Sequence, residues 1–215
     1  MSARQQPSQS VPTDDTARLQ TRYRLLEIAA RQFALQGFDG ASLRKIAEEA
    51  GVTAAAIYRH YPGGKSDLYA STLGLVSDTV SALVAGLAGN KGPIDQLVSQ
   101  SDMMWQFFER HPNVAAMVVR ENISGGANGP SPYFDQHMQV IGMIRTNLKQ
   151  AIGSGEIAQL NISAFIFWVT SYMSNFHGCR ALRDATWEEH DLKQAREEFL
   201  HEVRRRLEAG KAYSK

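Results

Sequence analysis

Residues 42–61, which read SLRKIAEEAGVTAAAIYRHY, constrain the fold of this chain most, because they predict two short helices joined by a tight turn. Ser42 can cap the first helix, whose apolar residues recur at helical spacing. Gly51 follows, where a left-handed residue commonly ends a helix, and Thr53 offers an N-cap for a second helix over 54–60. Two short helices this close, with small residues at the joint, indicate a helix-turn-helix.

The composition of the second helix favours contact with DNA. It begins with three alanines, whose small side chains let the backbone lie close to a large, flat partner. It ends with Tyr58, Arg59, His60 and Tyr61, which offer aromatic, cationic and hydrogen-bonding groups. This pattern is typical of a recognition helix in a major groove, with flanking residues on phosphates. The alternative is that both segments are merely short core helices of an all-α protein.

A long amphipathic helix is predicted just before this motif, over residues 15–36. Its apolar residues recur at alternating steps of four and three: Leu19, Tyr23, Leu26, Ala30 and Phe33. Gly37 is expected to end the helix, and Phe38 to anchor the chain in the core. Residues 15–65 are therefore predicted to form a three-helix DNA-binding domain.

These residues resemble the tetracycline-repressor (TetR) family of bacterial transcription regulators over residues 16–72. The matching pattern is Leu26-x-x-Ala29-Ala30-x-x-Phe33-x-x-x-Gly37-Phe38, then Ser42-Leu43-x-x-Ile46-Ala47-x-x-Ala50-Gly51-Val52, then Ile57-Tyr58-x-His60-Tyr61 and Lys65-x-x-Leu68. The chain departs from most of the family between Tyr61 and Lys65, where the step is four residues rather than three. The resemblance implies an all-α fold, in which the three-helix unit is followed by an all-helical ligand-binding and dimerisation domain.

We expect the helix-turn-helix to bind a double-stranded DNA operator through two groups of residues. The residues expected to face base edges are Ala54, Ala55 and Arg44. Those expected to lie on or beside phosphates are Ser42, Arg44, Thr53, Tyr58, His60 and Lys65. Tyr61 completes the expected DNA-binding set.

The remainder of the chain, 66–215, is predicted to be the second domain. Helices are expected from 65 or 66 to 86 or 89, and over about 93–110, 113–123, 133–152, 161–183 and 186–209. The segment 161–183 is apolar on more than one face, so it needs partners on more than one side. The resemblance implies that the last two helices pair with their symmetry mates in a homodimer. Their periodicity alone also allows a buried monomer core.

A cavity for a small molecule is expected between the middle helices of this domain. Soft apolar side chains that could line it are Trp105, Phe108, Met138, Phe165, Trp168 and Tyr172. Each of these could equally be plain core. Since the resembled family binds effectors in this domain, we expect a mostly lipophilic small-molecule effector.

The composition limits which cellular compartment and which partners are expected for this chain. Residues 1–14 are rich in Ser, Gln and Pro, so a disordered tail without a signal-peptide core is expected. The sequence has no apolar run long enough to span a membrane, and the single cysteine, Cys179, suits a reducing cytoplasm as a buried, inert thiol. The net charge of +1 does not by itself suggest nucleic acid.

Signatures of catalysis are missing from the sequence. Gly64-Lys65-Ser66 resembles the end of a phosphate-binding loop, but Arg59 stands where that loop needs its first glycine. The sequence has neither a His-x-x-x-His pair nor a Gly-x-Ser-x-Gly motif. We therefore expect no enzymatic activity, no metal and no cofactor.

Together these features favour a ligand-responsive transcriptional regulator. In this interpretation a homodimeric repressor binds a palindromic operator and is released by a lipophilic effector, whose signal travels through the helix that begins near Lys65. The alternative is an all-α small-molecule carrier or sequestering protein that does not use DNA. The sequence does not decide between repressor and activator.

Overall fold

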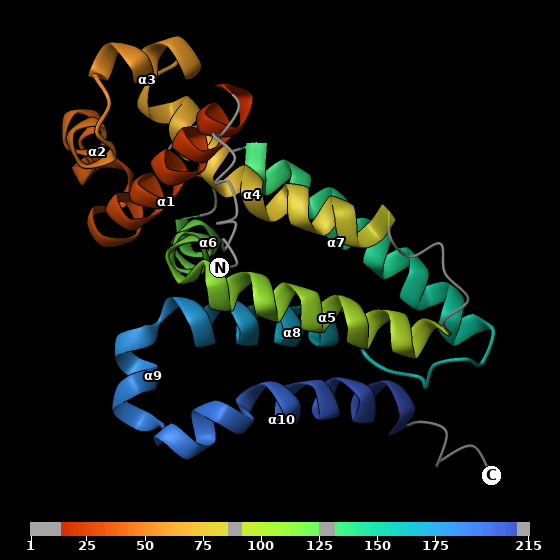
Figure 1. Cartoon of the computed structure of the whole chain (residues 1–215). Helices are drawn as coiled ribbons and strands as arrows, with labels where there is room; N and C mark the ends of the chain where they lie inside the picture. The colour runs from red at the N-terminus through yellow and green to blue at the C-terminus, as the bar shows by residue number, and fades with distance from the viewer. Residues whose placement is uncertain (1–13, 86–91, 125–131, 210–215) are drawn as a thin grey trace, which may run out of the picture.

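The computed structural model describes residues 14–85, 92–124 and 132–209, and over these ranges the chain is built from helices joined by short connections (Figure 1). The all-α fold class predicted from the sequence is confirmed for this part of the chain. The tail expected over residues 1–14 lies, apart from its last residue, outside the described residues.

The N-terminal unit consists of α1 (Asp14–Gly40), α2 (Leu43–Ala50), α3 (Ala54–His60) and the first half of α4 (Lys65–Ala85). Its core side chains are almost fully excluded from solvent: Leu26, Ala29, Ala30, Phe33, Ile46, Ala47, Ile57 and Leu68. At Gly37 the backbone of α1 leaves the helical conformation, with φ at 71° and ψ at 179°, which confirms the break predicted there. Burial of these side chains, at about 1.5–3 kcal/mol for each large one, holds the short helices together.

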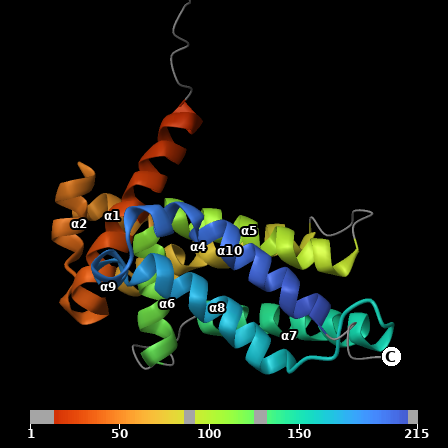
Figure 2. The same cartoon turned by 90° about the horizontal axis from the view of Figure 1, so that it is seen from below.

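The second unit comprises the C-terminal half of α4 and six further helices. These are α5 (Pro93–Arg110), α6 (Pro112–Ser124), α7 (Pro132–Gly153), α8 (Ile162–Gly178), α9 (Arg180–Thr186) and α10 (Glu189–Glu208). Viewed from below, α10 runs across α5 and α8, and α6 crosses one end of the bundle (Figure 2). Because α4 belongs to both units, it connects them as one continuous helix.

The single helix predicted over residues 161–183 is wrong. The chain forms α8 and then the short α9, with a break at Cys179, whose φ of −94° and ψ of 49° are not helical. Gly178 lies so close to α6 that a Cβ atom there would stand 2.8 Å from the backbone nitrogen of Ala116. Cys179 is only partly buried at this corner, so its expected burial is also wrong.

The apolar stripe of α10 is buried within the chain. Phe199 is 3% exposed, and its ring stacks on that of Tyr172 with the ring centroids 5.2 Å apart. It also stacks on Trp105 at 5.2 Å. Two ion pairs fix the same helix to α5, since Arg196 donates to Asp102 at 2.6 and 2.8 Å and Arg204 donates to Asp95 at 2.6 Å. This stripe is therefore monomer core.

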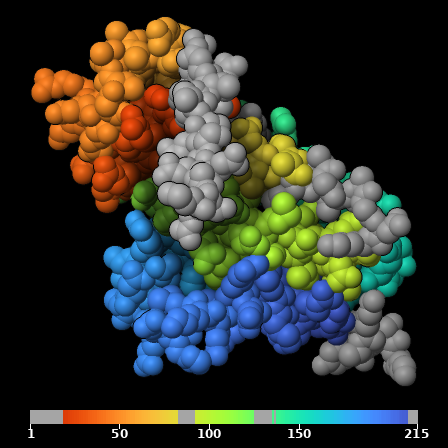
Figure 3. All heavy atoms as spheres, viewed as in Figure 1, coloured from red at the N-terminus to blue at the C-terminus, as the bar shows by residue number. Residues whose placement is uncertain are grey.

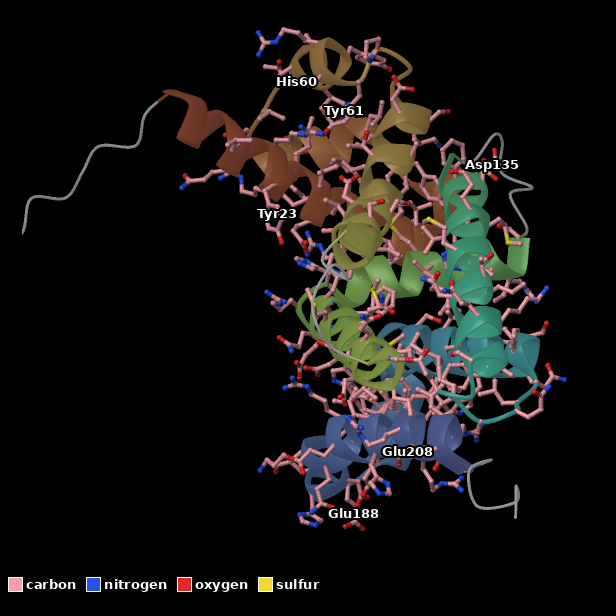
Figure 4. All side chains as sticks on the ribbon, turned by 90° about the vertical axis from the view of Figure 1, so that its right-hand side faces the viewer. Tyr23, His60, Tyr61, Asp135, Glu188 and Glu208 are labelled. Carbon is pink, nitrogen blue, oxygen red and sulfur yellow. The ribbon has the colours of Figure 1, made fainter. Side chains whose placement is uncertain are left out.

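Contacts with the C-terminal unit hold the N-terminal unit in place. The Tyr69 hydroxyl of α4 donates to a carboxylate oxygen of the buried Glu121 in α6, at 3.0 Å. At the corner between α5 and α6, His111 Nδ1 lies 2.6 Å from a carboxylate oxygen of Glu27. Figure 4 shows Tyr23 projecting from α1 toward the same corner, where its hydroxyl lies 3.0 Å from His111 Nε2.

Candidate nucleic-acid interface and ligand cavity

The turn between α2 and α3 is fixed by local hydrogen bonds. Gly51 adopts the left-handed conformation, with φ at 67°, and its N–H donates back toward the carbonyl groups of Ala47 and Glu48. The Thr53 hydroxyl accepts from the N–H of Ala56 at 3.1 Å, a cap typically worth about 1 kcal/mol. The caps predicted at Gly51 and Thr53 are confirmed, whereas the side-chain cap predicted at Ser42 is not formed. Ser42 takes the extended backbone of an N-cap, but its side chain makes no capping bond.

The α3 helix presents one face to solvent at the end of the molecule opposite α10 (Figures 1 and 3). Its core side is Ile57, which is fully buried. Its exposed residues are Ala54, Ala55, Tyr58, Arg59 and His60. An exposed helix of this kind, packed against α2 and anchored by Ile57, has a geometry suited to entering a major groove.

The long step between Tyr61 and Lys65 is accommodated by a glycine turn. Gly64 has a φ of +63°, so it adopts a conformation that other residues rarely take. The ring of Tyr58 packs directly on it, since a Cβ atom at Gly64 would lie 2.9 Å from Tyr58 Cε1. The N–H of Gly63 donates to the Asp67 carboxylate at 2.6 Å, which secures the start of α4. This glycine turn therefore also supports the ring of Tyr58.

The ammonium group of Lys65 turns toward the protein. It donates to the carbonyl oxygens of Asp39 at 3.1 Å and Ala41 at 3.3 Å, and lies 4.8 Å from the centre of the Phe38 ring. Lys65 therefore joins α4 to the connection between α1 and α2. Its expected phosphate contact stays a prediction.

Tyr61 does not belong to the exposed surface. Its side chain is 4% exposed, and its hydroxyl has no hydrogen-bond partner among the described residues. Figure 4 places Tyr61 below His60, toward the body of the N-terminal unit. Because it packs in the core, we correct its role from DNA contact to support of α3.

The other residues expected to contact DNA lie at the surface of the same unit. Arg44, Thr53, Ala54, Ala55, Tyr58 and His60 are exposed, whereas Ser42 and Lys65 are partly buried. Further exposed cations here that the sequence reasoning did not assign are Arg22, Lys45 and Arg59. The acidic Glu49 is paired with Arg31 at 2.5 Å, so part of the local negative charge is neutralised.

A cavity of about 110 Å³ lies between α4, α5, α6, α7 and α8. Most of its lining is aliphatic or aromatic. The residues that line it are Val76, Val80, Leu97, Gln100, Ser101, Met104, Phe108, Val118, Asn122, His137, Val140, Ile141, Ile144, Phe165, Ile166, Val169, Thr170, Met173 and Ser174. A pocket of this kind is suited to a small apolar molecule.

Two of the six cavity residues predicted from the sequence, Phe108 and Phe165, line this cavity. The other four do not. Trp105, Trp168 and Tyr172 pack around Phe199 beneath α10 instead, with ring centroids 5.2–5.6 Å from it. Met138 faces outward and is 49% exposed. Aromatic side chains on α5 and α8 can line the cavity or pack beneath α10, and their spacing in the sequence does not distinguish these two locations.

Sequence reasoning missed the contribution of α4 and much of that of α7. Val76 and Val80 come from the helix that also begins the DNA-binding unit, so they bring this helix into the cavity wall. From α7, Val140 and Ile144 face the cavity while Met143 is 43% exposed. Val76 and Val80, like Val140 and Ile144, are four residues apart, and this helical spacing is the sequence signal that marks them as one face of each helix.

The described lining of the cavity contains no Lys, Arg, Asp or Glu. Its one histidine, His137, has its pKa lowered by burial, which disfavours the charged imidazolium. Asn122, Gln100 and several hydroxyl groups supply hydrogen-bonding capacity without charge. The cavity is therefore suited to an uncharged ligand with a polar group.

Across the described ranges, no group of three or more His, Cys, Asp or Glu side chains is placed to hold a metal ion. Among the described helices, none combines the length and the apolar character that crossing a membrane requires.

Comparison with protein-family models identifies bacterial regulatory proteins of the tetR family over residues 25–72. The HTH-type transcriptional regulator LmrA of Bacillus subtilis is 42% identical over 48 residues, which are 22% of this chain and 26% of LmrA. The regulatory protein RaaS of Mycobacterium tuberculosis is 32% identical over 111 residues, 52% of this chain and 49% of RaaS. This chain thus spans about a quarter to a half of the length of the curated relatives it matches.

Solved structures extend the similarity over most of the chain. The TetR family transcriptional regulator PfmR of Thermus thermophilus superposes with a TM-score of 0.65 at 18% identity, covering 92% of this chain and 97% of PfmR. The ketosteroid transcriptional regulator KstR2 of M. tuberculosis gives a TM-score of 0.65 at 20% identity, covering 85% and 92%. At these identities the superposition shows a shared fold.

Proposed function

Because the chain belongs to the tetR family of bacterial regulatory proteins, we propose that it regulates transcription in the cytoplasm as a ligand-responsive, DNA-binding homodimer, most simply as a repressor. The observation that carries this proposal is the exposed face of α3, whose residues lie outside the hydrophobic core. The caps at Gly51 and Thr53 fix the direction in which α3 leaves the turn. The domain division that goes with it is 15–65 for DNA and 66–215 for ligand and assembly.

In this proposal α3 enters the major groove, and the residues around it contact the backbone. Arg44, Tyr58 and His60 would contact phosphates on the flanks of α3, while Ala54 and Ala55 would face the bases. Phosphate contacts orient the protein without reading sequence, and base edges specify the site.

The effector of the proposed regulator would occupy the cavity of about 110 Å³. Its wall includes Val76 and Val80 of α4, whose first turn is bonded through Lys65 to the DNA-binding unit. A ligand that binds better to a displaced α4 would shift the protein toward that state and change the separation of two recognition helices. This route supports release from a palindromic operator by a compact lipophilic compound.

The homodimer would use the outer faces of the last long helices. Phe167 on α8 is 73% exposed, so most of its ring is accessible to a second chain. It lies on the side of α8 away from the cavity residues Ile166 and Val169. A stable dimer would bury about 2,000 Å² or more in total. The partner of the cavity residues is thus a small molecule, and the partner of Phe167 is a second copy of the chain.

The rival function is an all-α carrier that sequesters a small molecule, which the cavity alone would serve. A gel-shift and footprint of the purified protein on the DNA that flanks its own gene separates the two. A protected site of two half-sites, about one helical turn apart centre to centre, supports the regulator. If the protein protects no specific sequence in this DNA or in a pool of genomic fragments, the carrier function is supported instead.

Replacing Tyr58 by Phe is expected to weaken binding to every DNA sequence by the same factor, about fivefold. The ring stays on Gly64 and only the exposed hydroxyl is lost, which removes a hydrogen bond worth about 1 kcal/mol. Arg44→Ala is the companion variant, because it removes one cation that is proposed to bind a phosphate. The slope of log affinity against log salt concentration should therefore become shallower by about one in Arg44→Ala, whereas it should stay unchanged in Tyr58→Phe. Fluorescence anisotropy against several duplexes at four salt concentrations measures both. A Tyr58→Phe protein with full affinity and altered base preference would contradict the assignment.

The charge-free cavity is expected to admit phenol but not benzoate, which share an aromatic ring and differ in charge at neutral pH. An unpaired carboxylate in an apolar site costs several kcal/mol, while phenol needs one hydrogen-bond partner. Phenol should therefore raise the thermal unfolding midpoint at millimolar concentration, and benzoate should not. Ile141→Trp, which fills the cavity, should abolish the phenol effect, and Met143→Trp on the exposed side of α7 should retain it. Equal stabilisation by benzoate would overturn this reading of the cavity.

A further inference from the structure

We propose that α3 selects its operator chiefly through thymine methyl groups in the major groove, which meet the side chains of Ala54 and Ala55. This inference rests on the proposed DNA-binding function and names the base chemistry that the same surface recognises.

The outward face of α3 carries methyl groups where DNA-reading helices commonly carry long polar side chains. Ala54 and Ala55 are the first two residues of the helix, and both are exposed. Ile57 points into the core and Ala56 is partly buried, so neither adds a group to this face. Over the first turn, the surface that would meet base edges is made of two adjacent Cβ methyl groups.

The polar residues near this turn make other contacts within the protein. The Thr53 hydroxyl accepts from the N–H of Ala56 as the helix cap. The ring of Tyr58 rests on Gly64, at the side where α4 begins. Arg59 and His60 line a hollow shared with Leu19 and Arg22 of α1, so they lie toward α1. These positions suit phosphate contacts on the flanks and leave the centre of the face apolar.

The major groove offers a single apolar group, the C5-methyl of thymine. The other edges present hydrogen-bond donors or acceptors: N7 and O6 of guanine, N7 and the amino group of adenine, and the amino group of cytosine. Pressed against an alanine methyl, those groups would lose water without gaining a partner. A thymine methyl in the same place gains by burial instead. Since alanine is short, the helix backbone can also approach closely enough to make the contact.

Two adjacent alanines would cover neighbouring base steps, so each half-site should contain thymines at adjacent or nearly adjacent positions under the start of α3. The thymines could stand on either strand, because both strands present their methyl groups in the major groove.

The test uses the full-length protein and duplexes that it enriches from a random DNA library. In the enriched site, each thymine is replaced singly by deoxyuridine, which removes one methyl group and keeps every hydrogen bond of the base pair. We expect one or two positions in each half-site to weaken binding about fourfold, the value for losing one buried methyl group, while all other thymines tolerate uracil.

Variants of the protein identify which side chain meets the methyl group. Ala55→Gly should reduce the thymine-to-uracil difference at one position toward unity, and Ala54→Gly should do the same at its neighbour. Ala56→Gly is the matched control, since it makes the same change in the same helical turn off the outward face, and it should leave the differences intact. Comparing ratios of affinities for each variant cancels any general loss of helix stability.

The outcomes separate this inference from the function on which it rests. Failure to enrich any sequence, with no binding to duplex DNA, would overturn the DNA-binding function itself. Specific binding to a site with G·C pairs under α3, or with no effect of uracil, would overturn the methyl readout alone. Uniform weakening by uracil at every thymine, unaltered in the alanine variants, would assign the effect to DNA flexibility and likewise overturn it.

Discussion

Replacing Phe199 by Asp is expected to unfold the C-terminal unit of the chain. The ring is 3% exposed and lies between Trp105, Tyr172 and Trp168 within a single chain. Truncating a buried Phe typically costs about 3–5 kcal/mol, and an unpaired buried carboxylate adds several more. The sum rivals the whole stability of an ordinary domain, about 5–15 kcal/mol. Far-UV circular dichroism should show cooperative loss of helix at 25 °C.

The matched control is a charge on the exposed aromatic of α8. Phe167→Asp should keep the helical signal of the wild-type protein, while sedimentation at micromolar concentration should shift from the proposed dimer to a monomer. Phe199 and Val203 are both buried within one chain, so a charge at either position is expected to disrupt the fold of that chain before it disrupts a dimer. A folded, monomeric Phe199→Asp protein would contradict this expectation.

Replacing Gly178 by Ala is expected to destabilise the protein by about 1–3 kcal/mol, although alanine is the better helix former. Its Cβ would lie 2.8 Å from the backbone nitrogen of Ala116 and 2.9 Å from the carbonyl carbon of Ala115. A backbone cannot rotate away as a flexible side chain can, so α6 and α8 must separate and lose packing. Urea unfolding at fixed protein concentration measures the change.

Gly74→Ala in the middle of α4 is expected to change the stability in the opposite direction. A Cβ atom there meets nothing within 4 Å, so the substitution should stabilise the protein by about 0.4–1 kcal/mol. If both substitutions stabilise the protein, the close approach of α8 to α6 does not constrain residue 178.

The helix-turn-helix could be predicted from sequence because its signals are local. The end of α2 depends on Gly51 and the start of α3 on Thr53, and each acts through hydrogen bonds to residues within four positions. The break in α1 at Gly37 has the same origin. Such features need no knowledge of the rest of the chain.

Other features depend on contacts far along the chain, and sequence periodicity does not report them. The helix break at Cys179 follows from α6 crossing at Gly178, and the apolar pattern runs through that point without interruption. The sequence does not distinguish Tyr61 from its exposed neighbours, because aromatic residues occur both in cores and on surfaces and only tertiary packing decides between them. Similarly, Trp105 and Phe108 lie one turn apart on α5, yet one packs beneath α10 and the other faces the cavity.

One short segment of α6 contacts both the cavity and the N-terminal unit. Val118 and Asn122 face the cavity, whereas Arg120 donates to the carbonyl oxygen of Ala34 at 2.9 Å and Glu121 accepts from Tyr69. If the chain is the inducer-responsive repressor proposed above, mutants that no longer respond to the inducer and mutants that no longer repress would arise at interleaved codons of this one segment. The two properties would then be difficult to evolve independently, because a change that admits a new inducer would also alter the affinity for the operator.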